Sequence, residues 1–160
     1  MSDDFNLYTH FRAQFDEHAA DELLCTGDGR SYRYADIDAR SAALAAYLTG
    51  TKFVGKFTVD GKEDEQPKTE EYTISKCEKL DQPDMYRLTA RIKYGEVDNE
   101  IPLELKILWS GNTPVITLDS FWIPGLGTFD ARVLIHSGRY AGTWQHDEVG
   151  GHMFGAIEKQ

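Results

Sequence analysis

Three histidines near the end of the chain are the residues best suited to bind a metal ion. His146 and His152 flank a turn at residues 147–151, and His136 lies on the preceding predicted strand. If these segments form a hairpin, His146 and His152 face each other across it, next to the carboxylates of the turn. Zinc requires three or four ligands that converge at about 2 Å. The sequence therefore offers His136, His146 and His152 as a candidate metal site, with exposed turn residues as the alternative.

Four aromatic residues suit an apolar binding cavity. They are Phe57, Trp109, Phe129 and Trp144. Each falls on the apolar side of a predicted strand and would line the interior of a small barrel, which has room for side chains or for one small ligand. Three glycines on apolar sides, Gly55, Gly142 and Gly155, would leave space for that ligand. The alternative is a filled core in which these glycines mark bulges or close packing.

Nucleophilic and phosphate-transfer chemistry find little support in the sequence. Cys25 falls in a predicted strand and is expected to be buried, whereas Cys77 ends a strand and is expected to be buried or half-exposed. No glycine-flanked nucleophile elbow and no complete glycine-rich phosphate loop occurs. We therefore expect no catalytic residues and no cofactor.

From Lys52 onward, apolar and polar residues alternate, which is typical of strands with one buried face. Turn residues separate about eight such runs, and short connections make consecutive strands antiparallel. The pattern predicts an antiparallel eight-stranded up-and-down β-barrel, with a β-sandwich as the alternative. Pro102 lacks a ladder donor and should lie at an edge, a bulge or a strand start. The acidic segment 62–71 is expected to be a solvated loop.

The beginning of the chain follows a mostly helical pattern. Apolar residues four positions apart predict a helix over 5–15, and an alanine-rich stretch predicts a second helix over 35–48. Between them, Asp28-Gly29 lies between two short apolar runs and favours a β-hairpin. The predicted fold class is therefore α+β, with a helix–hairpin–helix segment over 1–50 and a barrel domain over 51–160.

Two parts of the chain resemble known families. The motifs of the first part are Asn6-Leu7-Tyr8, Asp28-Gly29-Arg30-Ser31-Tyr32-Arg33-Tyr34-Ala35-Asp36-Ile37-Asp38 and Ala42-Ala43-Leu44-Ala45-Ala46-Tyr47-Leu48. They resemble the N-terminal scaffold of adenylate-forming acyl-CoA ligases of the malonyl-CoA synthetase type. The phosphate loop, the acidic ribose motif and the catalytic lysine of that family have no counterpart in this sequence. The resemblance therefore implies a scaffold fragment without adenylation activity. The segment 138–155 resembles the Gly-x-Trp strands of lipocalin-like and avidin-like barrels and of uncharacterised bacterial β-rich proteins.

The net charge of the chain disfavours two classes of partner. Its formal net charge of -10 repels phosphate backbones and anionic membrane surfaces. No apolar run approaches the ~20 residues of a membrane-spanning helix, and no secretory signal is visible. Two cysteines suit a reducing compartment. We therefore expect a cytoplasmic protein with neither nucleic acid nor membrane as a partner.

These observations predict a non-catalytic binding or structural β-barrel module, with a small apolar ligand as its partner. The apolar run around Trp122 is buried on both sides or forms an exposed patch. If it is exposed, it favours self-association into a homo-oligomer. The alternative function is a truncated acyl-CoA-ligase-like (AMP-forming) protein that lacks its catalytic motifs.

Overall fold

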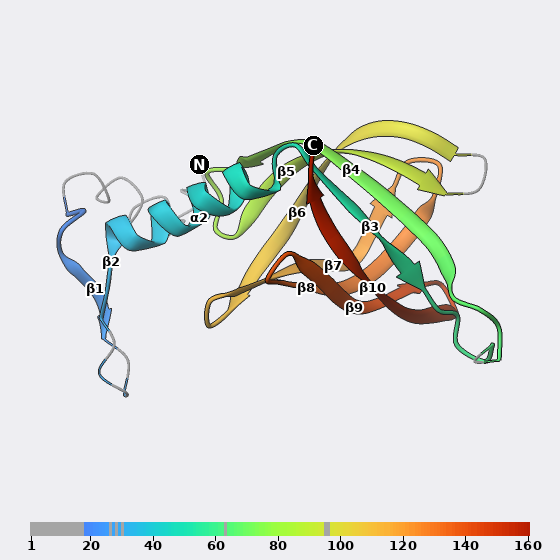
Figure 1. Ribbon diagram of the computed structural model, residues 1–160. Coiled ribbons are helices and arrows are strands. Elements are labelled where there is room, and N and C mark those ends of the chain that lie inside the picture. Colours follow the sequence, from blue (N-terminus) through green and yellow to red (C-terminus); the bar gives the residue numbers. More distant parts are fainter. Residues whose placement is uncertain (1–17, 26, 28, 30, 63, 95–96) are drawn as a thin grey trace, which may run out of the picture.

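The described part of the chain is a closed barrel with one helix and a small hairpin attached (Figure 1). The computed structural model describes residues 18–25, 27, 29, 31–62, 64–94 and 97–160. The elements are β1 (Glu22–Cys25), β2 (Ser31–Arg33), α2 (Tyr34–Leu48), β3 (Thr51–Phe57), β4 (Lys68–Lys79), β5 (Met85–Tyr94), β6 (Val97–Ser110), β7 (Thr113–Ile123), β8 (Gly127–His136), β9 (Arg139–His146) and β10 (Val149–Lys159). The helix predicted over 5–15 lies outside the described residues.

Strands β3 to β10 form the barrel. Each pairs antiparallel with the next along the chain, and β10 pairs with β3 to close the ring. The predicted antiparallel barrel of eight strands is thus confirmed, and the sandwich alternative is wrong. The ladder between β6 and β7 joins only Lys106–Ser110 to Thr113–Thr117, so residues 97–105 of β6 form no ladder with β7.

Side chains alternate between the interior and the outer wall along each strand. In β8, Val133 and Ile135 are buried, whereas Leu134 and His136 are exposed. This period of two follows from the pleat, and burial of the apolar set stabilises it by about 25 cal/mol per Å² removed from water. Pro102 lies in the stretch of β6 that pairs with β5 alone, because the pairing between β6 and β7 begins at Lys106.

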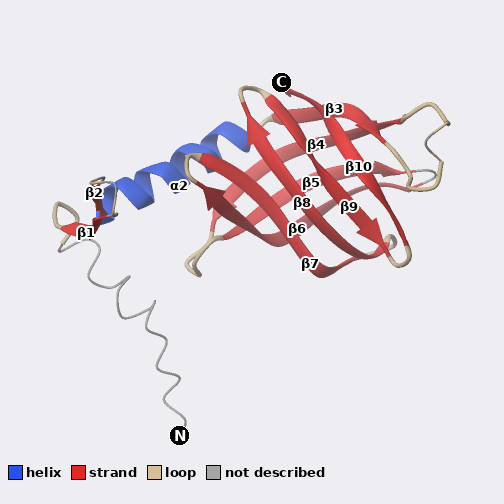
Figure 2. Ribbon diagram, turned by 90° about the horizontal axis from the view of Figure 1, so that it is seen from below, coloured by secondary structure: helices blue, strands red, loops and turns tan. Residues whose placement is uncertain are grey.

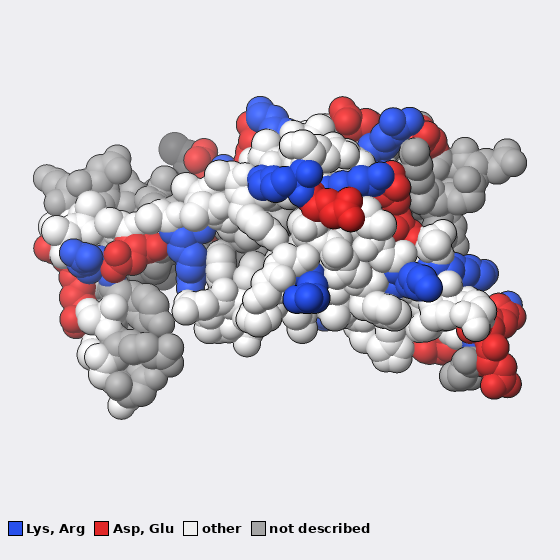
Figure 3. All heavy atoms as spheres, in the orientation of Figure 1, with Lys and Arg blue, Asp and Glu red and all other residues white. Residues whose placement is uncertain are grey.

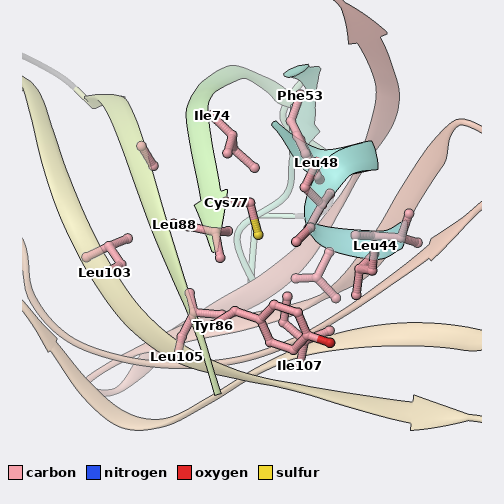
Figure 4. Packing of buried hydrophobic residues seen from close by; sticks show 14 of the residues in the cluster. Leu44, Leu48, Phe53, Ile74, Cys77, Tyr86, Leu88, Leu103, Leu105 and Ile107 are labelled. Carbon is pink, nitrogen blue, oxygen red and sulfur yellow. The ribbon is translucent and has the colours of Figure 1, made fainter. Parts of the chain in front are cut away.

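One end of the barrel is filled by side chains and covered by α2. We call it the helix end; β4 ends and β5 begins there. Leu44 and Leu48 of α2 belong to the same buried cluster as Cys77, Tyr86 and Ile107 of the barrel (Figure 4). The opposite end, where β3 leads to β4 and β9 turns into β10, is called the far end. The core therefore draws on residues from both sides of position 50.

Polar contacts hold the C-terminal end of α2 against the barrel. The ammonium group of Lys159 donates to the carbonyls of Ala46, Tyr47 and Thr49 at 3.3, 2.7 and 2.9 Å. Such carbonyls have no partner within a helix, and a cation there also offsets the negative end of the helix dipole. The hydroxyl of Thr49 accepts a hydrogen bond from the backbone N–H of Cys77 at 2.9 Å. The helix is thereby fixed to both β4 and β10.

The other half of α2 and the β1–β2 hairpin project away from the barrel (Figure 2). The amide of Arg33 donates to the carboxylate of Asp36 at 3.0 Å, which satisfies a backbone group near the start of the helix. Among the described residues, no helix is both long enough and apolar enough to cross a bilayer.

Candidate functional site

Burial changes along the axis of the barrel. At the helix end, Leu48, Tyr86 and Ile107 are 0% exposed. Most inward-facing side chains toward the far end are only partly buried: Phe57, Phe121, Phe129, Trp144, His146 and Met153. The ladder between β6 and β7 is confined to the helix end, so the wall is unpaired between these two strands toward the far end. Solvent therefore enters from the far end, which is the candidate binding site.

Three of the four aromatic residues predicted to bind a ligand lie toward this far end. The rings of Phe57 and Trp144 meet edge to face, with centroids 5.7 Å apart. Phe129 stacks on the ring of His146 at 4.5 Å. Trp109 lies instead at the helix end, where the Arg40 guanidinium is 4.2 Å from its ring centroid. The structure thus brings together the aromatic residues of β3, β8 and β9 and separates Trp109 from them.

Two of the predicted glycines are covered by an aromatic ring rather than by empty space. Tyr140, Gly155, Gly55 and Glu70 form one row across β9, β10, β3 and β4. A Cβ atom at Gly155 would lie 2.7 Å from Cε1 of Tyr140, and one at Gly55 would contact its hydroxyl. The Tyr140 side chain therefore crosses two strands over glycine, as the close-packing alternative predicted. At Gly142, a Cβ would meet the backbone of Arg132.

A second aromatic side chain packs over a glycine nearer the far end. Trp144 pairs with Gly151 of β10, and its indole N–H donates to the carbonyl of Thr58 at 3.2 Å. A Cβ at Gly151 would lie 3.1 Å from the indole nitrogen and in contact with the Thr58 carbonyl. Glycine on β10 thus fixes Trp144 flat against the inner wall of the barrel.

A buried carboxyl lies at the end of the row that Tyr140 spans. Glu70 is 8% exposed and accepts hydrogen bonds from the hydroxyls of Tyr140 at 2.8 Å and Tyr72 at 3.0 Å. Burial raises the pKa of Glu70, and the two tyrosine hydrogen bonds act in the opposite direction. Burial together with the Glu70 carboxylate also raises the pKa of Tyr140. Within the described part of the chain, no cationic side chain forms an ion pair with Glu70.

Glu70 was missed by the sequence analysis, which placed it in a solvated loop over 62–71. The structure includes residues 68–71 in β4, so this part of the loop prediction is wrong. A signal was present, because Glu70, Tyr72 and Ile74 continue one alternating face. The adjacent charged residues at 70 and 71 obscured it, although only Glu71 points outward, where it pairs with Lys52 at 2.8 Å.

The structure does not bring the three candidate metal ligands together. In the β9–β10 hairpin, His146 pairs with Val149 and His152 with Thr143, so the two histidines lie three ladder positions apart. Alternation then places His146 inside, while His152 and His136 are exposed on the outer wall. Residues 18–160, apart from the undescribed positions, contain no group of three or more side chains able to hold a metal ion.

The cysteines differ in exposure. Cys25 is exposed in β1, so the expectation that it is buried is wrong. Cys77 is buried beside α2, and burial raises the pKa of its thiol to about 12. A thiol that stays protonated is a poor nucleophile.

An apolar row crosses the outer wall of the barrel. Its members pair in sequence across β6 to β10: Leu108, Val115, Leu134, Ala141 and Phe154. Two grooves of about 570 and 350 Å³ lie along it, both lined by Leu134, His136 and Ala141. On the face shown in Figure 3, the lower part of the barrel is mostly uncharged with isolated cationic atoms, whereas cationic and acidic atoms lie side by side above it. Trp122 is also exposed, at 64%, on β7.

No family model, no curated protein and no solved structure matches this chain.

Proposed function

We propose that the chain is a non-catalytic binding module whose barrel accepts a small apolar ligand at the far end. The observation that carries the proposal is the change in burial along the barrel axis. Leu48, Tyr86 and Ile107 are fully buried where α2 covers the barrel, whereas the inward-facing Phe57, Phe129 and Trp144 toward the opposite end are only partly buried. Apolar side chains near a few convergent polar groups at the mouth of a barrel are typical of a small-molecule site.

In this proposal the two ends of the barrel have different roles. In this proposal the chain is an up-and-down barrel of lipocalin-like form, and the helix–hairpin–helix segment closes one end. Leu44 and Leu48 occupy that end from above, so a ligand is restricted to the other. Phe57 and Trp144 would then form the apolar contact surface and Glu70 a polar contact below it.

Fluorescence of the tryptophans tests the proposal. A neutral apolar probe, N-phenyl-1-naphthylamine, should bind saturably and receive excitation energy from Trp144. Trp144→Phe should remove most of this energy transfer, whereas the control Trp122→Phe, on the outer wall, should retain it. Absence of saturable binding to the unmodified chain would contradict the proposal.

The resemblance of residues 1–50 to acyl-CoA ligases is retained as a proposal about the origin of this segment. The motifs of adenylation have no counterpart in the sequence, so we expect no ATP–pyrophosphate exchange with malonate or other carboxylates. Turnover in that assay would favour the alternative function, a truncated AMP-forming ligase-like protein.

Self-association is a second candidate function, and the outer row favours it. Leu108, Leu134 and Phe154 are 40%, 43% and 45% exposed, a contiguous apolar surface of the kind that marks interaction sites. The chain has a net charge of -10, so two copies repel each other over most of their surfaces. The residues of the row include no carboxylate, so this repulsion is weakest there. A second copy of the chain is therefore the partner proposed for this row.

A further inference from the structure

We infer that the ligand taken at the far end carries an organic ammonium group, which the carboxyl group of Glu70 receives. The inference rests on the proposed function and narrows it from an apolar ligand to an apolar ligand with a cationic nitrogen. Its basis is the arrangement of one carboxyl and two phenol groups inside an aromatic wall.

Glu70 is a buried acid that forms no ion pair with any side chain in the described part of the chain. Its two oxygens accept hydrogen bonds from Tyr72 and Tyr140, but the described residues supply no cation to pair with it. An ionised carboxyl in apolar surroundings is costly unless it is paired as well as hydrogen-bonded. Each carboxylate oxygen keeps a further lone pair after accepting one hydrogen bond. A bound cation would supply the missing charge.

The cluster offers acceptors to a ligand. Tyr140 directs its hydroxyl hydrogen to Glu70, so the oxygen of this hydroxyl presents lone pairs to other groups. Such a cluster matches a protonated amine, whose N–H groups can donate to these oxygens. It opposes the carboxylate of a fatty acid or a phosphate ester, because like charges would then be buried together.

Aromatic rings lie between Glu70 and the far end. Glu70 pairs with Gly55, and Phe57 follows two residues later on the same inner face, beside Trp144. On the helix side, the ring of Phe53 packs 5.0 Å from that of Tyr140. Aromatic faces attract cations by about 0.5–2 kcal/mol each, which is why ammonium ligands are held by aromatic walls.

The position of Glu70 in its strand gives access from the far end. It is the third residue of β4, which begins at the far end, and its neighbour Tyr72 is partly exposed. Lys68 lies on the same face two residues earlier but is exposed, where water and salt screen its charge. His146, a further titratable group on the inner wall toward the far end, stacks on Phe129.

Calorimetric titration with three amphiphiles of the same alkyl chain tests the inference: decylammonium, decanol and decanoate, each below its micellar concentration. The unmodified chain should bind the ammonium compound at least about tenfold more tightly than the alcohol, and the carboxylate most weakly. Glu70→Gln should remove this preference, so that the ammonium compound and decanol bind with similar affinity. The matched control is Glu71→Gln, whose side chain points to the outer wall, and it should keep the preference.

The outcomes separate the inference from the proposed function. If decanol binds and the ammonium compound binds no better, or if decanoate binds best, the inference is wrong and the binding function stands. If none of the three binds, both fail. Should Glu70→Gln lose its cooperative thermal unfolding, the ranking of the three head groups on the unmodified chain decides alone.

Discussion

Tyr140 reaches Glu70 across two strands because the positions beneath its ring are glycines. A methyl group at Gly55 would contact the Tyr140 hydroxyl and the backbone carbonyl of Phe154. The carbonyl cannot move without disturbing the pairing of β10 with β3. The buried hydrogen bond to Glu70 and the wall of the barrel thus depend on the same small residue.

Gly55→Ala should therefore lower the free energy of unfolding by about 2–4 kcal/mol through overpacking. The control is Gly27→Ala, because nothing lies within 4 Å of a Cβ at that position. That change should stay within about 0.5 kcal/mol of the unmodified chain. Urea denaturation measures both variants, and equal stabilities would show that Tyr140 does not need the glycine.

The raised pKa of Glu70 makes stability depend on pH. Because the folded state holds the Glu70 proton more tightly than the unfolded state, the free energy of unfolding falls as pH rises from the unfolded pKa, about 4.3, through the folded pKa. The contribution is about 1.4 kcal/mol for each unit by which the pKa is raised.

Glu70→Gln should remove this dependence. The difference in unfolding free energy between the variant and the unmodified chain should therefore shift in favour of the variant between pH 4 and pH 8. Urea denaturation across this range measures it, with Glu71→Gln, which changes a carboxyl on the outer wall, as the control. A difference that shifts the other way would mean that Glu70 is stabilised as a carboxylate in the free protein.

The packing of α2 against the barrel depends on contacts with β10, the last strand. Lys159 of β10 donates to three carbonyls at the end of α2, and Leu48 beside them is fully buried. Lys159→Ala should lower the free energy of unfolding by about 1 kcal/mol, since charge-assisted contacts to a helix terminus are of that size. Lys106→Ala, an exposed position on β6, is the control for loss of a surface lysine. Equal unfolding midpoints for the two variants would contradict this role of Lys159.

The elements themselves were accessible to sequence reasoning. Strands such as β8 alternate strictly because one face is buried in a single interior, and the helix predicted over 35–48 is observed as α2 at Tyr34–Leu48. Phe57 and Trp144 were assigned to the interior by the same rule. Alternation gives the side of a strand on which a residue lies but not its height along the barrel, so Trp109 was grouped with residues of the opposite end.

The polar part of the site could not be predicted in the same way. The environment of Glu70 depends on Gly55, Gly155 and Tyr140, which lie on three other strands and up to 85 positions away. Their common row follows from the pairing register, which is fixed only when the barrel closes. The metal site predicted at the histidines is wrong for the same reason. It requires His146 and His152 to face each other, and the register of β9 and β10 keeps them apart.

At the scale of the whole molecule, the outer row predicts association. If a second copy covers Leu134 and its neighbours, the unmodified chain should sediment as a dimer at high micromolar concentration. Leu134→Lys should sediment as a monomer, because it places a charge in the apolar contact. Thr128→Lys, exposed elsewhere on β8, should remain dimeric. A chain that is monomeric at every concentration would exclude the proposed partner.

In the proposed function, α2 closes one end of the barrel and a ligand binds at the other. The indole N–H signals of three tryptophans report on it, because Trp109 lies at the helix end, Trp122 on the outer wall and Trp144 on the inner wall toward the far end. In two-dimensional ¹H–¹⁵N spectra recorded during titration with decanol, a site at the far end predicts a saturable shift of the Trp144 signal alone. A shift confined to Trp109 or Trp122, or no shift in any of the three, would contradict it.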